Sequence, residues 1–184
     1  MKAEREIAML EIRKAAVGEY GQVVDFYYNL IDALAQTRYK PGWKKEIYPT
    51  RESLREAIAR QELYVGTKEG QILSSMILNH ACHEDYSKVS WNIQAEDREI
   101  LVIHALGVHP AFSRQGLAKE MVQKAIETAE KEQAKTIRLD VLEGNLPAEK
   151  AYLKMGFQYC GTVKMFYPDT GLADYRLFDL KIRR

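Results

Sequence analysis

The change from strand to helix in this chain is clearest in the segment VHPAFSRQGLA, residues 108–118. A nearly continuous apolar run from Ile100 to Val108 leads into it and is typical of a buried, central strand. An amphipathic pattern follows from Gly116 to Gln133, with aliphatic residues on one face and Lys, Gln and Glu on the other. The sequence therefore predicts a strand, a glycine-containing turn and a helix N-terminus, in that order.

The turn into this helix has the chemistry of an anion site. The first amides of a helix have no intrahelical acceptor and lie at the positive end of its dipole, so they bind phosphate well. Gly116 would let a ligand approach the backbone, and Arg114 could add a charge-assisted contact. The spacing is not that of a Walker loop or of a three-glycine dinucleotide fingerprint. An ordinary strand-to-helix turn remains the alternative for this segment alone.

Outward from this segment, hydrophobic periodicity predicts a mixture of helices and strands with no internal linker. The predicted ranges are a strand over 9–15, a helix with apolar residues from Val23 to Leu34, a short helix after Thr50, strands over 63–67 and 72–79, the central strand over 100–108, a helix over 116–133, a strand over 136–142, a helix from Pro147 to Gly156, and strands over 157–166 and 175–182.

Composition narrows the class of protein. The chain has 184 residues, 46% of them hydrophobic, enough for the core of one domain. A net charge of +1 argues against a protein that coats nucleic acid or an acidic membrane, and no run is long and apolar enough to span a bilayer. The start lacks the pattern of a secretory signal. Cys82 and Cys160 stand in no metal-binding spacing, so we expect a cytoplasmic protein without a metal site.

A second motif follows the strand over 136–142: NLPAEKAYLKMGF, residues 145–157, which reads N-x-x-A-x-x-x-Y-x-x-x-G-F. Together with the V-x-P and G-x-A pattern of residues 108–118, it resembles the GNAT superfamily of acetyl-CoA-dependent N-acetyltransferases. The resemblance is detailed over 100–157. It implies one domain over 1–184 and an α/β fold, in which a central mixed sheet of about seven strands is flanked by about four helices.

The resemblance also implies which residues bind the coenzyme. Backbone groups at the end of the central strand, splayed from the next strand, would hold the pantetheine arm, with Gly107 in a bulge. Ser113 departs from the family, which usually has Gln or Arg there. Tyr152 would act as general acid at the coenzyme sulfur, and Asn145 would brace the acceptor or the pantetheine amide. The full implied set is Leu106, Gly107, Val108, Ser113, Arg114, Gln115, Gly116, Leu117, Ala118, Asn145, Ala148 and Tyr152.

An amine acceptor must lose a proton before it attacks, because an alkylammonium has a pKa near 10.4. His104 is the candidate base: it shares a strand face with Val102 and Leu106, and the unperturbed pKa of histidine suits the task. A hydrogen-bonded core histidine is the alternative, and Glu99 is the next candidate base. Asp140 and Glu143 lie at the end of a strand next to Asn145; surface carboxylates are the favoured interpretation, and contact with a cationic acceptor is the alternative.

Aromatic residues outside the motifs can line an acceptor pocket, namely Tyr39, Trp43, Tyr48, Tyr86 and Trp91. Trp43, Tyr86 and Trp91 are the predicted substrate-binding residues, and core anchors are the alternative. The expected reaction is acetyl transfer from acetyl-CoA to a primary amine of a small metabolite, peptide or protein, by direct attack in a ternary complex. The alternative is an inactive module that binds or senses acyl-CoA. The expected partners are acetyl-CoA, the amine and, in a homodimer, a second copy of the chain, with no nucleic acid or membrane.

Overall fold

The computed structural model describes residues 10–183. In chain order its helices and strands are β1 (Glu11–Lys14), α1 (Tyr20–Ala35), α2 (Arg51–Ala59), β2 (Leu63–Lys68), β3 (Gln71–Asn79), β4 (Ile100–Val108), α3 (Leu117–Lys131), β5 (Thr136–Leu142), α4 (Leu146–Lys154), β6 (Gln158–Tyr167) and β7 (Gly171–Lys181). Each predicted element is present. Met9, the first residue of the first predicted strand, lies outside the described residues, and β7 begins at Gly171 rather than Tyr175.

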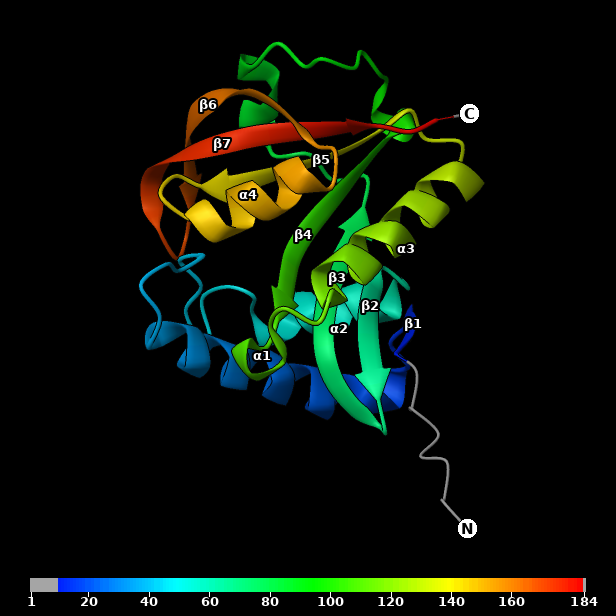
Figure 1. Cartoon of the computed structure of the whole chain (residues 1–184), viewed down its shortest axis with the longest axis vertical. Helices are drawn as coiled ribbons and strands as arrows, with labels where there is room; N and C mark the ends of the chain where they lie inside the picture. The colour runs from blue at the N-terminus through cyan, green and yellow to red at the C-terminus, as the bar shows by residue number, and fades with distance from the viewer. Residues whose placement is uncertain (1–9, 184) are drawn as a thin grey trace.

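All seven strands form one sheet in the order β1-β2-β3-β4-β5-β7-β6 (Figure 1). The pairings are antiparallel except between β4 and β5, which run parallel. The connection between these two strands is α3, as a parallel pair requires a crossover. The predicted mixed sheet of about seven strands with about four helices is confirmed.

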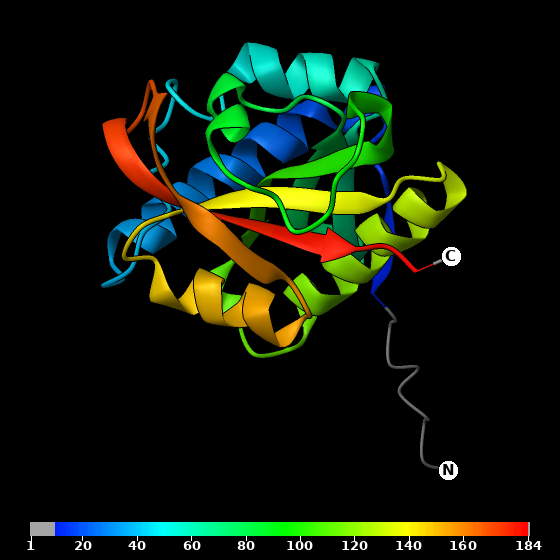
Figure 2. The ribbon, with the colours of Figure 1, turned by 90° about the horizontal axis from the view of Figure 1, so that it is seen from above.

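Helices cover both faces of the sheet (Figure 2). The first core cluster packs the apolar stripe of α3, centred on Met121 and Ala125, with residues of α4 against one face. On the opposite face, α1 and α2 cover the strands at the β1 side. The connection over 80–99 covers the rest of that face through Tyr86 and Trp91. Two covering layers therefore meet on this second face, over the middle of the sheet.

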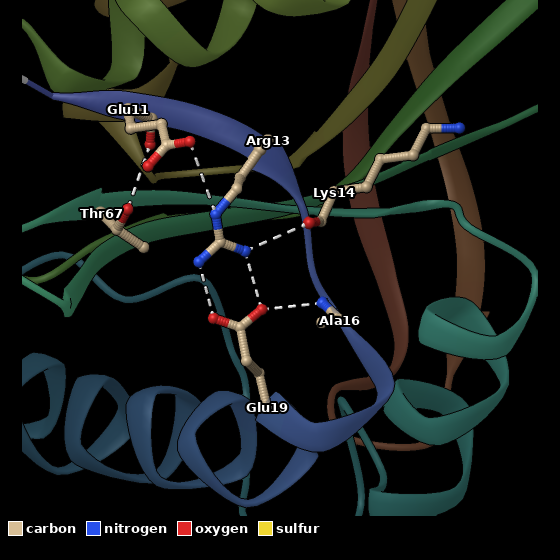
Figure 3. A network of polar contacts seen from close by, with 6 residues as sticks. All are labelled: Glu11, Arg13, Lys14, Ala16, Glu19 and Thr67. Carbon is tan, nitrogen blue, oxygen red and sulfur yellow. Dashed lines mark hydrogen bonds and ion pairs between the residues drawn. The ribbon is translucent and has the colours of Figure 1, made fainter.

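The edge strand β1 is tied to the start of α1 by a fork of ionic hydrogen bonds (Figure 3). The Arg13 guanidinium donates to both carboxylate oxygens of Glu19, at 2.8 and 2.7 Å. The Ala16 amide donates to the same carboxylate at 2.7 Å. These bonds lower the pKa of Glu19 to about 2, with the Arg13 hydrogen bond as the largest cause. The contacts fix where α1 begins, and so how it lies across the sheet.

Candidate active site

The ends of β4 and β5 diverge. The two strands pair only where Ile100–Val102 meets Thr136–Arg138, and Figure 1 shows them separating beyond that point. From Ile103 onward, the edge of β4 that faces β5 has no strand partner within residues 10–183. Unpaired backbone groups on such an edge can bind an extended ligand as a strand would.

A β-bulge lies close to this divergence. His104 pairs with Ile77 of β3 and Gly107 pairs with Ser75, so two residues of β4 lie opposite one residue of β3. The first of the two, Ala105, has φ of 48°, in the left-handed region. The bulge therefore precedes Gly107, and the prediction that Gly107 sits in a bulge is wrong.

Gly107 serves close packing instead. A Cβ atom there would lie 2.3 Å from Cδ2 of Leu30 and 3.3 Å from Cζ3 of Trp43. The missing side chain lets α1 and the loop that follows it pack directly on the end of β4. Trp43 is thereby brought to the mouth of the gap between β4 and β5.

The bulge also reverses the direction of the side chains that follow it. Val102 belongs to the core under the 80–99 connection, whereas Leu106 packs against the core under α3 and α4. The predicted face shared by Val102, His104 and Leu106 is therefore wrong, because one extra residue inverts the alternation. Buried Tyr27 of α1 donates a hydrogen bond to the Ala105 carbonyl at 2.8 Å and so holds the bulge in place.

The N-terminus of α3 has an open backbone. Arg114 and Gly116 have φ values of 63° and 79°, and Gly116 is the N-cap. The Glu120 amide donates to the Gly116 carbonyl at 3.0 Å, so the amides of 117–119 precede the first turn bond. A Cβ on Gly116 would meet no heavy atom within 4 Å. Residues 113–116 are exposed, so the backbone that leads into the first turn of α3 is accessible to an anion.

A cavity of about 100 Å³ occupies the gap between the diverging strands. Six of the residues predicted for the site line it, namely Trp43, His104, Leu106, Asn145, Ala148 and Tyr152. Five further lining residues have polar or aromatic side chains, namely Tyr48, Asp140, Tyr167, Asp169 and Tyr175. Residues 107–108 and 113–118 lie outside this lining.

Tyr152 lines this cavity. Its ring packs edge-on against Phe157, with centroids 5.4 Å apart. The hydroxyl has no hydrogen-bond partner in the described part of the chain. Burial raises the pKa of Tyr152, and the charge of Asp140 raises it further. The phenol therefore keeps its proton at neutral pH and can donate it.

His104 lines the cavity as a neutral ring. Its Nε2 lies 2.9 Å from Oδ1 of Asn79, which also accepts from the Ala81 amide. Burial lowers the pKa of His104 to about 4, so the expectation of an unperturbed pKa is wrong. Glu99, the second candidate base, precedes the opposite end of β4 and pairs with Lys135 at 2.8 Å.

Asp140 lies half-buried in the cavity wall rather than exposed at a strand end. Its Oδ2 accepts hydrogen bonds from the hydroxyls of Tyr86, at 2.7 Å, and Tyr167, at 2.9 Å. Burial raises the pKa of Asp140, and these two hydrogen bonds oppose that effect. Glu143, by contrast, is exposed. Asp140 is one of two carboxylates in the lining, and its position there contradicts the favoured interpretation as a surface residue.

Tyr86 and Trp91 lie behind the cavity and not in its lining. Both are buried, and their ring centroids are 5.2 Å apart. The Trp91 indole donates to the Tyr86 carbonyl at 2.8 Å, and its ring stacks on the Arg138 guanidinium at 4.1 Å. Of the three predicted substrate-binding residues, the geometry therefore places only Trp43 in the wall. Tyr86 acts on the cavity through its bond to Asp140.

The low pKa of His104 predicts a pH-dependent stability. Protonation favours the unfolded chain, where histidine has a pKa near 6.5, so the free energy of unfolding falls as pH drops from 6.5 toward 4. We expect wild type to lose about 2 kcal/mol more than His104→Gln between pH 7.5 and pH 4.5. Urea denaturation of both proteins at the two pH values measures this difference. Parallel losses would show that the ring titrates normally in the folded state.

Comparison with known proteins gives a consistent set of relatives. The profile of the acetyltransferase (GNAT) family matches residues 28–157. An uncharacterised N-acetyltransferase of Methanocaldococcus jannaschii, MJ1207, is 33% identical over 75 residues, 41% of this chain. A protein of Bacillus subtilis with a provisional assignment as a [ribosomal protein bS18]-alanine N-acetyltransferase is 30% identical over 66 residues, 36% of this chain. The chain spans 33% and 44% of the lengths of these two relatives.

Solved structures share the fold over most of the chain. A GNAT-family acetyltransferase from Streptococcus agalactiae has a TM-score of 0.79 at 22% identity, covering 95% of this chain and 96% of that one. The yncA protein of Salmonella typhimurium, whose structure contains its cofactor acetyl-CoA, has a TM-score of 0.70 at 14% identity, covering 96% of both chains. At these identities the likeness shows a common fold.

Proposed function

The chain belongs to the acetyltransferase (GNAT) family, and we propose that it transfers an acetyl group from acetyl-CoA to a primary amine. The observation that carries this proposal is the unpartnered Tyr152 hydroxyl, which lines the cavity where β4 and β5 diverge. A proton donor at that place can protonate the thiolate that leaves during acetyl transfer. The hydroxyl makes no hydrogen bond to a described residue, so the fold does not require it.

The residues present fit acetyl-CoA on the donor side. The open backbone of 113–118 suits its diphosphate, and the Gly116 position leaves room for it. The free edge of β4 at Leu106–Val108 suits the amide groups of the pantetheine arm, with Asn145 and Ala148 opposite. When bound, acetyl-CoA supplies the activated acetyl group.

Two residues carry the proton chemistry in this proposal. Tyr152 donates the hydroxyl proton to the departing sulfur, which its raised pKa permits. Asp140 accepts a proton from the incoming ammonium, because it lines the same cavity and burial raises its pKa. His104 contributes shape and a neutral nitrogen rather than basicity. The nitrogen gives up two protons in all: one goes to Asp140 and then to solvent, and the other restores the Tyr152 hydroxyl.

Direct transfer is favoured over a cysteine-bound acetyl group. Neither Cys82 nor Cys160 lines the cavity. Burial raises the pKa of Cys82 and brings that of Cys160 to about 11, so both thiols stay protonated at neutral pH. A thiol in that state is a poor nucleophile, which supports attack by the amine within a ternary complex.

A thiol-release assay over a panel of amines tests the function. We expect thiol release from acetyl-CoA to depend on enzyme and on at least one class of primary amine, and the acetylated amine to appear in equal amount by mass spectrometry. Calorimetry with acetyl-CoA provides the control for binding. A protein that binds acetyl-CoA but never accelerates release above background would contradict the proposal and support the inactive binding module.

A further inference from the structure

Two carboxylates in the cavity wall have no cation within ion-pair distance among residues 10–183, although the charge of Lys44, which lies outside the lining, acts on Asp169. Asp140 bonds only to tyrosine hydroxyls, and Asp169, which is 5% exposed, accepts a hydrogen bond from the Thr170 amide at 3.0 Å. Neither forms an ion pair with any residue in 10–183, and no Lys or Arg lines the cavity. His104 is neutral at pH 7. Asp169 is buried and Asp140 half-buried, and carboxylates withdrawn from water are costly without a close cation, so the cavity is suited to a ligand that brings positive charge.

An aromatic wall stands beside these carboxylates, formed by Trp43, Tyr48, Tyr167 and Tyr175. Their rings follow one another, with centroid separations of 6.4 Å from Trp43 to Tyr48, 6.4 Å from Tyr48 to Tyr167, and 5.0 Å from Tyr167 to Tyr175. Such rings attract alkylammonium groups and pack against methylene chains.

The Tyr48 hydroxyl supports a ligand site independently of the acidic residues. Tyr48 is half-buried and lines the cavity, and burial raises its pKa. Its hydroxyl has no hydrogen-bond partner among the residues that the structure describes. It is therefore free to bond to a ligand in the cavity.

We propose that the amine acceptor is a short aliphatic diamine, with its reacting nitrogen at Asp140 and its distal ammonium held by Asp169 and the aromatic wall. This inference rests on the acetyl transfer proposed above. The charges balance: the two carboxylates match two ammonium groups on binding, and after Asp140 takes up the proton of the reacting nitrogen, Asp169 still pairs with the distal cation. A carboxylate on the acceptor would be repelled by both aspartates.

Three matched acceptors test the class at saturating acetyl-CoA. They are 1,4-diaminobutane, n-butylamine, which lacks the second charge, and ornithine, which is 1,4-diaminobutane with a carboxylate added. We expect kcat/KM for 1,4-diaminobutane to exceed that for each of the others by about tenfold or more. Equal values for butylamine, or for ornithine, would overturn the inference.

Asp169→Asn tests the residue. Its side chain can still accept from the Thr170 amide, so the turn is retained. We expect kcat/KM for 1,4-diaminobutane to fall by about tenfold and that for butylamine to stay within about twofold. Asp174→Asn is the matched control, because Asp174 lies on the same hairpin but pairs with Lys164 at 3.1 Å, outside the cavity lining. An equal loss for both amines in Asp169→Asn would overturn the assignment of the distal site.

The two proposals fail in different ways. If acetyl-CoA binds and no amine is acetylated, both the transferase function and the acceptor class are wrong. If butylamine or a peptide with an N-terminal alanine is acetylated while 1,4-diaminobutane has no advantage, the transferase function stands and the diamine is wrong. The comparison of three acceptors uses the unmodified protein, so it decides even if Asp169→Asn does not fold.

Discussion

Replacing Tyr152 with phenylalanine is expected to lower kcat for acetyl transfer by about 10²- to 10⁴-fold, the usual contribution of a positioned proton donor. The ring contact with Phe157 remains, and the lost hydroxyl has no hydrogen-bond partner within residues 10–183. The substitution therefore removes a proton and little else. The dissociation constant of acetyl-CoA, measured by calorimetry, is expected to stay within a few fold of wild type, so the defect lies in kcat.

Tyr159→Phe is the matched control for this substitution. Tyr159 is 43% exposed on β6, outside the cavity lining, and its hydroxyl lies 2.8 Å from that of Thr162. We expect wild-type kcat from it. If Tyr152→Phe also turns over at the wild-type rate, a water molecule or another group protonates the sulfur, and the proposed role of Tyr152 is wrong.

Gly116→Leu is expected to weaken acetyl-CoA binding by at least about a hundredfold, because the side chain would enter the space assigned to the diphosphate. A leucine at φ of 79° also strains the backbone, at a cost of about 1–2 kcal/mol in the free energy of unfolding. Calorimetry with CoA measures the first effect and urea denaturation the second.

Gly70→Leu separates these two effects. Gly70 lies in the turn between β2 and β3 with φ of 77°, and a Cβ there also meets nothing within 4 Å. We expect both variants to lose similar stability and only Gly116→Leu to lose the coenzyme. Wild-type CoA affinity in Gly116→Leu would mean that the diphosphate binds elsewhere.

Hydrophobic periodicity was sufficient to predict the helices and strands, because each of them buries one face. The predicted ranges 100–108 and 136–142 agree with β4 and β5 to the residue. The bulge at Ala105 could not be found in the same way, since it depends on how β4 registers with β3 and on the hydrogen bond from Tyr27. A glycine at position 107 suggested a bulge there. In the structure, glycine is needed because a Cβ atom would clash with Leu30, which is distant in the sequence.

The position of Asp140 in the cavity could not be predicted from the sequence either, because it depends on which segment covers β5. The alternation in β5 marks Arg138 and Asp140 as a polar, outward face. In the folded chain the aperiodic 80–99 connection covers that face, with Trp91 on the arginine and Tyr86 on the aspartate. Tyr86 and Trp91, the two aromatic residues of the otherwise polar 80–99 segment, were the sequence feature that could have indicated this cover. Their role is to bury β5, not to contact the acceptor directly.

The walls of the cavity belong to separable parts of the chain. The donor side is built from β4 and α4, whereas the acceptor side combines Asp140 of β5 with the loop after α1 and the tip of the β6–β7 hairpin. Sequence changes in those two connections can therefore alter which nucleophile the protein accepts without changing the residues that bind the thioester. For protein engineers, the same partition marks the loop over 41–48 and the hairpin tip over 167–175 as segments to transplant between relatives.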